Sequence, residues 1–109
     1  MKRYAVELTS DAQLDLDDIA DYIGAHDGME RAELVARGIE KAYAELAVYP
    51  NRGAHPRELL ELGIRSFREM HFKPYRIIYR VYERTVIVFL IADGRRDMQA
   101  LLTSRVLGA

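Results

Sequence analysis

The chain has 109 residues, half of them hydrophobic, which suits a single domain over residues 1–109 with a core of its own. It has no cysteine, which excludes a disulfide framework and a thiolate metal site. Its longest apolar run, Val86 to Ala92, is much shorter than the roughly 20 residues that span a bilayer, and no apolar signal segment opens the sequence. We therefore expect a soluble, cytoplasmic protein with no membrane partner.

The net charge of −1 hides an asymmetry between the two halves of the chain. Residues 1–50 carry 11 acidic and 5 basic side chains, whereas residues 51–109 carry 6 acidic and 11 basic ones. Two interpretations stay open. Either the basic half meets nucleic acid or an acidic protein, or the two halves neutralise each other across their own interface.

The first half of the sequence predicts a short strand and two helices. Tyr4 to Leu8 alternates as a strand does, and the capping box that begins at Ser10 predicts a helix to about Ala25 with Ser10 as its N-cap. A second helix runs from about Met29 to Val48, and Pro50 ends it. A glycine-bearing loop joins the two into an antiparallel hairpin, whose apolar stripes must pack on another layer.

After Pro50 the hydrophobic period changes to two. Strands are predicted over Ile64–Phe72, Tyr75–Glu83 and Thr85–Ala92, with a tight hairpin at Arg84, and a last helix over about Met98–Leu107. The order β-α-α-β-β-β-α is typical of an α+β fold in which the helical hairpin packs on one face of a small, mostly antiparallel sheet.

The strand that begins at Tyr75 has two different faces. One face is apolar and aromatic and suits a core under the helices: Tyr75, Ile77, Tyr79 and Val81. The other face mixes arginines with apolar groups: Arg76, Ile78, Arg80 and Tyr82. We expect this second face to stay open, either as a binding face or as an ordinary solvated sheet surface.

Two stretches resemble the toxins of the RelE/ParE superfamily, which belong to type II toxin–antitoxin modules. They are YRIIYRV, from Tyr75 to Val81, and DGRRD, from Asp93 to Asp97, and they follow an acid-rich helical hairpin. The resemblance covers nearly the whole chain and implies the same fold. It also implies a toxin that arrests growth and stabilises plasmids, with a cognate antitoxin as its partner in a heterotetramer or larger complex.

Members of the superfamily act in one of two ways, and the resemblance implies that this protein uses one or the other. RelE-like members cleave mRNA on the ribosome, and the candidate catalytic residues for that reaction are Arg68, His71, Arg76 and Arg96. Leu102, however, stands where such nucleases carry a tyrosine, and no tyrosine or histidine follows Tyr82. This gap favours ParE-like inhibition of DNA gyrase, which needs no enzyme activity. The alternatives are a ribosome-dependent mRNA endonuclease and a non-toxic member that only binds a partner.

Four arginines are the candidates for contact with the target or the antitoxin: Arg76, Arg80, Arg95 and Arg96. Of the adjacent pair Arg95 and Arg96, we expect one to face a partner and the other to pair with Asp97 or with the acidic helices. No spacing of His, Asp and Glu predicts a metal site, and no glycine-rich phosphate loop is present, so we expect neither a metal nor a cofactor.

Overall fold

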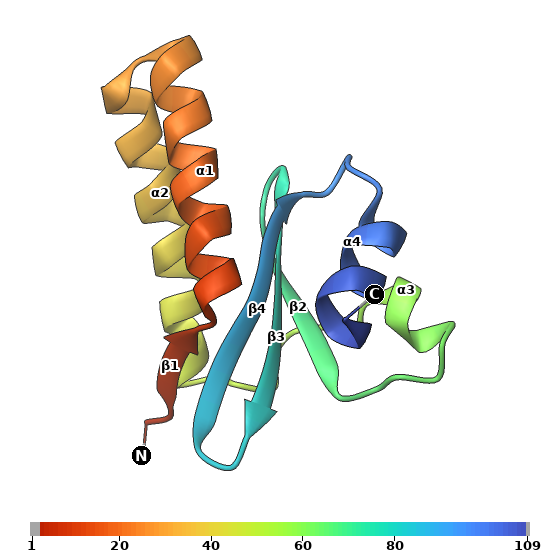
Figure 1. The fold of residues 1–109 in the computed structure, drawn as a ribbon. Helices are drawn as coiled ribbons and strands as arrows, with labels where there is room; N and C mark the ends of the chain where they lie inside the picture. The colour runs from red at the N-terminus through yellow and green to blue at the C-terminus, as the bar shows by residue number, and fades with distance from the viewer. Residues whose placement is uncertain (1–2, 109) are drawn as a thin grey trace.

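The computed structural model describes residues 3–108, which form a four-stranded sheet between two unequal helical layers (Figure 1). The strand order is β1-β4-β3-β2, with bounds Ala5–Leu8, Thr85–Asp93, Tyr75–Tyr82 and Phe67–Phe72. β1 runs parallel to β4, and the other neighbours are antiparallel. The predicted α+β class is confirmed. Within residues 3–108, no helix is long and apolar enough to cross a membrane.

The larger helical layer is the predicted hairpin of α1 (Ser10–Asp27) and α2 (Met29–Ala44), which continues into the 3-10 turn η1 (Glu45–Ala47). Gly28 joins the two helices with a φ of 94°, a value that favours glycine. The cap was predicted one residue too late, because Thr9, not Ser10, accepts the bond from the Ala12 N–H at 3.1 Å. Thr9 also ends β1 by donating its backbone N–H to Val88, so the chain turns there.

The hairpin packs on one face of the sheet, as predicted. Ile39 and Leu46 lie in the same fully buried cluster as Ile77 and Tyr79 of β3. The Tyr79 hydroxyl donates to the Pro50 carbonyl at 2.8 Å and accepts from the Gly53 N–H at 3.1 Å, so no polar atom of this ring is left unpaired. Tyr79 thereby fixes the loop that follows the hairpin.

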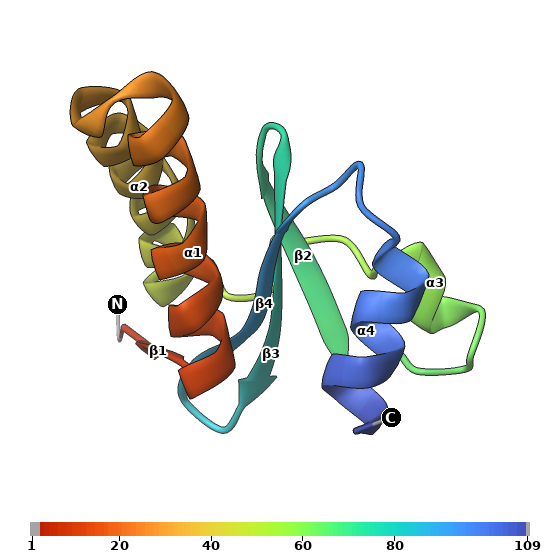
Figure 2. The same ribbon diagram turned by 45° about the horizontal axis from the view of Figure 1, so that its top comes forward.

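The second face of the sheet is not open, which corrects the sequence prediction. The last helix, α4 (Met98–Leu107), has the predicted bounds and lies on this face beside a short helix that was not predicted, α3 (Arg57–Leu60) (Figure 2). Leu59 and Leu102 bury Ile78 of β3 completely. Only the half near the β3–β4 turn stays uncovered, where Tyr82 is 55% exposed.

A bulge in β4 changes which side chains of the strand pack on each of the two helical layers. The register with β3 shifts after Ile78, which pairs with Leu90, and the next pair joins Tyr79 to Val88, so Phe89 has no partner. Leu90 therefore faces α4, while Val88 faces the hairpin.

The free edge of β4 beside this bulge is closed by an ion pair. Asp15 of α1 accepts from the Ile91 N–H at 3.0 Å, and Arg105 of α4 donates to the Phe89 carbonyl at 2.7 Å. The two side chains also join each other through two bonds of 2.8 and 3.0 Å. The carboxylate raises the pKa of Arg105. This pair fastens the two helical layers together across the edge of the sheet.

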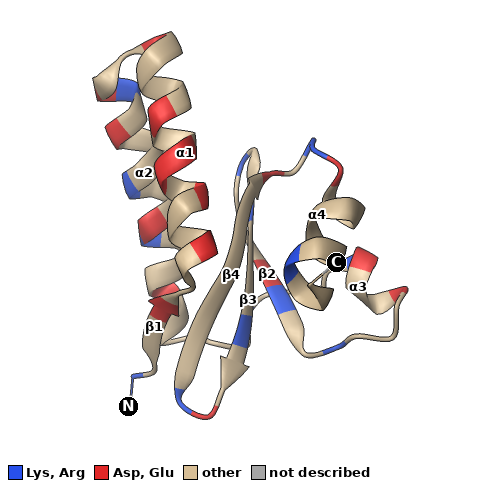
Figure 3. Ribbon diagram, viewed as in Figure 1, with Lys and Arg blue, Asp and Glu red and all other residues tan. Residues whose placement is uncertain are grey.

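The acidic and basic halves of the chain stay largely apart (Figure 3). Ion pairs between residues 1–50 and 51–109 are confined, among the described residues, to Arg105 with Asp11 and Asp15 and to Arg52 with Glu45. Most acids of the hairpin and most arginines of the second half therefore remain available to other partners. The interpretation that the two halves neutralise each other is wrong for most of these charges.

Candidate functional site

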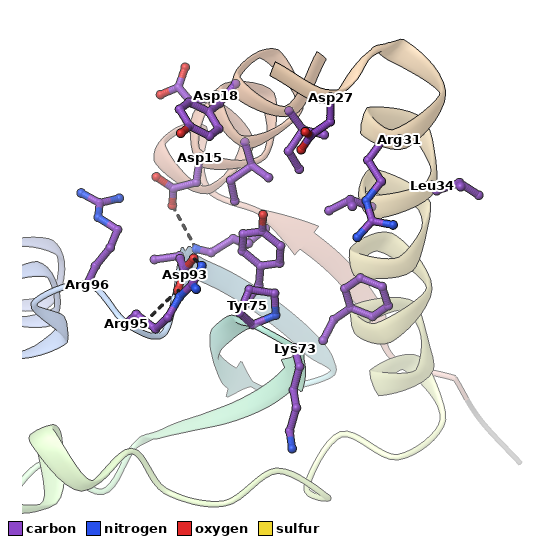
Figure 4. A pocket seen from close by; sticks show the side chains of 18 residues that line it. Asp15, Asp18, Asp27, Arg31, Leu34, Lys73, Tyr75, Asp93, Arg95 and Arg96 are labelled. Atoms are coloured by element: carbon purple, nitrogen blue, oxygen red, sulfur yellow. Dashed lines mark hydrogen bonds and ion pairs between the residues drawn. The ribbon is translucent and has the colours of Figure 1, made fainter. Parts of the chain in front are cut away.

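A groove of about 750 Å³ lies between the hairpin and the end of the sheet where β4 ends and β2 turns into β3 (Figure 4). Its apolar lining comes from both layers: Ile19, Ile23, Val35, Phe72, Tyr75 and Ile91. Phe72 reaches it because Gly38 of α2 has no side chain, and a Cβ at Gly38 would collide with the Phe72 ring. The groove thus combines apolar side chains of both layers with charged ones.

Charged side chains of both signs surround this groove. Asp18, Asp27 and Arg31 border it on the helical side, and Arg95 and Arg96 border it on the side of the loop before α4. A groove that combines apolar side chains with charged groups is typical of sites that bind a partner segment.

The loop Asp93–Asp97 holds its two arginines differently. The Asp93 carboxylate accepts from the backbone N–H, Nε and Nη2 of Arg95 at 2.9, 2.9 and 2.6 Å, and this pairing lowers the pKa of Asp93. Asp97 caps α4 by accepting from the Ala100 N–H. The sequence predicted that one arginine of this loop pairs with Asp97 or with an acidic helix. This prediction is wrong, because the arginine that forms a pair, Arg95, pairs with Asp93. Arg96 extends away from this pair and forms no ion pair within residues 3–108 (Figure 4).

Arg76 is enclosed by carboxylates. It donates to both oxygens of Glu58 at 2.8 and 2.9 Å and to Glu69 at 2.6 Å, and its side chain is 15% exposed. These bonds hold the pKa of Glu58 at about 2 and raise the pKa of Arg76. Two carboxylates leave no positive charge free at this position, so Arg76 does not lie on an open face as the sequence analysis expected.

The other candidate catalytic residues either bond to other groups of the fold or lie apart from Arg76. Arg68 donates to the Gly53 carbonyl at 2.8 Å, and His71 is exposed, with its Nε2 3.6 Å from Glu69. Arg96 lies in the loop before α4. Leu102 is fully buried against the sheet, so its position in α4 faces the core.

Among the described residues, Arg80 and Arg68 are the strand arginines of the candidate set that meet no carboxylate, and of these two Arg68 is bound to the Gly53 carbonyl. The Arg80 guanidinium lies over the Tyr82 ring, 5.7 Å from the centroid, on the uncovered half of the sheet. Within residues 3–108 no three His, Cys, Asp or Glu side chains are grouped to hold a metal ion.

Sequence reasoning missed the roles of Glu58, Asp15 and Arg105, which take part in the partly buried ion pairs of the fold. Only Glu58 has a local signal, since it follows Pro56 in the first turn of α3, a position that acidic residues favour.

Comparison with known proteins gives consistent matches. A family model described as the ParE toxin of the type II toxin–antitoxin system, parDE, matches residues 6–98. Toxin ParE3 of Caulobacter vibrioides is 30% identical over 88 residues, which are 81% of this chain and 84% of that protein.

Two solved structures share the fold. A chain of the chromosomal ParDE system from P. aeruginosa has a TM-score of 0.71 at 23% identity, over 84% of this chain and 96% of that one. A chain of the toxin–antitoxin complex RelBE2 from Mycobacterium tuberculosis has a TM-score of 0.58 at 24% identity, over 85% and 93%.

Proposed function

The chain belongs to the ParE toxin family of type II toxin–antitoxin systems, and from this premise we propose that it arrests growth by inhibiting DNA gyrase. A cognate antitoxin holds it inactive in the cell. The observation that carries the choice of gyrase over mRNA cleavage is the enclosure of Arg76 by Glu58 and Glu69.

Metal-free RNA cleavage needs cations that stabilise the phosphorane and an acid that protonates the leaving oxygen. With two carboxylates within 2.9 Å of its guanidinium, Arg76 belongs to a cluster of net charge −1, and this cluster repels a phosphate rather than stabilising one. The buried Leu102 supplies no proton. Inhibition of gyrase by binding requires neither group.

We place the antitoxin in the groove of Figure 4. An amphipathic segment fits its apolar side chains, and acidic side chains of that segment meet Arg31 and Arg96 at its borders, since Arg95 is already paired with Asp93. Two structural relatives come from a ParDE system and a RelBE2 complex, which supports a protein partner of this kind. Opposite charges at the border make association fast and sensitive to salt.

Purified protein should inhibit supercoiling by gyrase and leave ribosome-bound mRNA intact. The Arg96→Ala variant should inhibit less while unfolding at the same temperature, because Arg96 is exposed and forms no ion pair in the described chain. The matched control is Arg37→Ala, which removes an exposed arginine of α2 that pairs with Glu33.

Two outcomes contradict this function. If mRNA is cut at defined codon positions and His71→Gln abolishes the cutting, the protein is a RelE-like endonuclease. If cells expressing soluble protein without its antitoxin grow normally, it is a non-toxic partner-binding member.

A further inference from the structure

The topology of the sheet gathers four arginines at one end. Because β1 is parallel to β4 and β3 is antiparallel to both its neighbours, the starts of β1, β2 and β4 and the end of β3 coincide. Arg3 precedes β1, Arg65 precedes β2, Arg80 lies near the end of β3, and Arg84 lies in the β3–β4 turn. Figure 3 shows basic segments at this end, opposite the tip of the acidic hairpin. We call these four residues the arginine end.

These arginines differ from Arg76 and Arg95 at the other end of the sheet, although Arg96 at that end is also without an ion pair in the described chain. There, Arg76 and Arg95 are bound by carboxylates. At the arginine end, none of the four forms an ion pair with a described residue, although Glu7 of β1 and Glu83 of the turn lie on the same elements. The guanidinium N–H groups are therefore available to an external anion.

Two of the four are held in place by aromatic rings. Arg84 lies over Tyr4 at 4.7 Å from the ring centroid, and Arg80 lies over Tyr82 at 5.7 Å. Stacking on a ring restricts the guanidinium but leaves its in-plane donors free, and those donors match the oxygens of a phosphate. Less conformational entropy is then lost when an anion binds.

From this arrangement we propose that the arginine end binds the phosphate backbone of duplex DNA without regard to sequence. Adjacent strands lie about 4.8 Å apart, so the four strands spread these charges over about 14 Å, close to the roughly 12 Å width of the major groove. Protein–DNA interfaces are polar and strongly basic, whereas a protein partner would need an apolar centre. On the strands at this end, only Tyr82 is a large exposed hydrophobic side chain. DNA binding goes beyond the proposed function and holds whether or not gyrase is the target.

The test is fluorescence anisotropy of a labelled DNA duplex with the full chain over a series of salt concentrations. If all four arginines contact phosphates, the slope of log K against log salt should approach about −3.6, since each contact contributes about −0.9. The Arg80→Gln/Arg84→Gln variant should make this slope less steep by about 1.8 and weaken binding about tenfold or more at low salt.

The control variant is Arg37→Gln/Arg57→Gln, which removes the same charge from exposed positions of α2 and α3 and should bind DNA as the wild type does. If the double variant of the arginine end does not fold, Arg80→Gln alone suffices, because its stacking partner Tyr82 is itself exposed; its slope should change by about 0.9. The proposal is overturned if the wild type does not bind DNA at low salt, or if both double variants lose binding equally. It is also overturned if the arginine-end variant binds DNA normally and loses the antitoxin instead.

Discussion

Replacing Glu58 by Gln should lower the free energy of unfolding by about 3 kcal/mol at neutral pH. Glu58 and Arg76 are 13% and 15% exposed and share two bonds of 2.8 and 2.9 Å. Their pairing lowers the pKa of Glu58 from 4.5 to about 2. Each pKa unit corresponds to about 1.4 kcal/mol, so a shift of about 2.5 units gives about 3–3.5 kcal/mol. Breaking a buried ion pair costs about 3–5 kcal/mol, and the lower value fits because Glu69 stays bonded to Arg76.

The sign of the pH dependence follows from the lowered pKa. Because the folded pKa of Glu58 lies below its unfolded value, the stabilisation is complete above about pH 5 and is lost as the pH falls toward 2. Urea unfolding followed by circular dichroism measures it. The difference between wild type and Glu58→Gln should shrink from about 3 kcal/mol at pH 7 to about half of that at pH 3.

Glu33→Gln is the matched control. It removes a carboxylate that bonds an arginine at 2.9 Å, as Glu58 does, but Glu33 and Arg37 are 61% and 72% exposed, so the loss should stay below about 0.5 kcal/mol. The reasoning is refuted if Glu58→Gln loses less than about 1 kcal/mol at pH 7, the most that exposed pairs usually contribute. A loss that does not change between pH 7 and pH 3 refutes it as well.

Three further changes test other contacts. Asp15→Asn and Arg105→Gln should each destabilise the fold, and a double-mutant cycle in urea should give a coupling above about 1 kcal/mol; additive losses would contradict the link between α1 and α4. Gly38→Ala should displace the Phe72 ring, lowering stability by about 1–3 kcal/mol and weakening antitoxin binding measured by calorimetry; unchanged values would contradict the close packing. Tyr79→Phe leaves two backbone groups unpaired and should cost about 1–3 kcal/mol, whereas a neutral thermal unfolding profile would contradict the role of its hydroxyl.

Much of the fold follows from local patterns in the sequence. The stripes of the hairpin and the alternation of β3 from Tyr75 to Val81 identify the hairpin-side core, because each is a repeated pattern over several turns or pairs. The bounds of α4 follow in the same way. The N-cap was misplaced because Thr9 and Ser10 are both good caps, and the long-range bond from Thr9 to Val88 decides between them.

The second layer was hidden for physical reasons. α3 has four residues, too few to show an apolar stripe. After α3 the chain turns at Gly63, where the Ile64 N–H donates to the Leu59 carbonyl. Ile64 therefore belongs to this turn, and the strand that was predicted from Ile64 begins only at Phe67. The bulge at Phe89 lies in a wholly apolar run. Such a run has no alternation of apolar and polar residues that a bulge could interrupt, so the sequence gives no sign of it. No local pattern can therefore predict which residues close the edge of β4.

β3 explains why the position of an arginine does not define its chemistry. Arg76 and Arg80 lie on the same face of one strand, four residues apart, and the alternation of the strand predicts the same environment for both. α3 brings Glu58 to the first of them, and β2 adds Glu69, so the charge of Arg76 stabilises the fold. No described carboxylate reaches the second, which stacks on Tyr82 with its donors free. The difference arises largely from a four-residue helix, and we therefore expect Arg80, rather than Arg76 at the position the superfamily pattern indicates, to be the arginine of this strand that binds an anion.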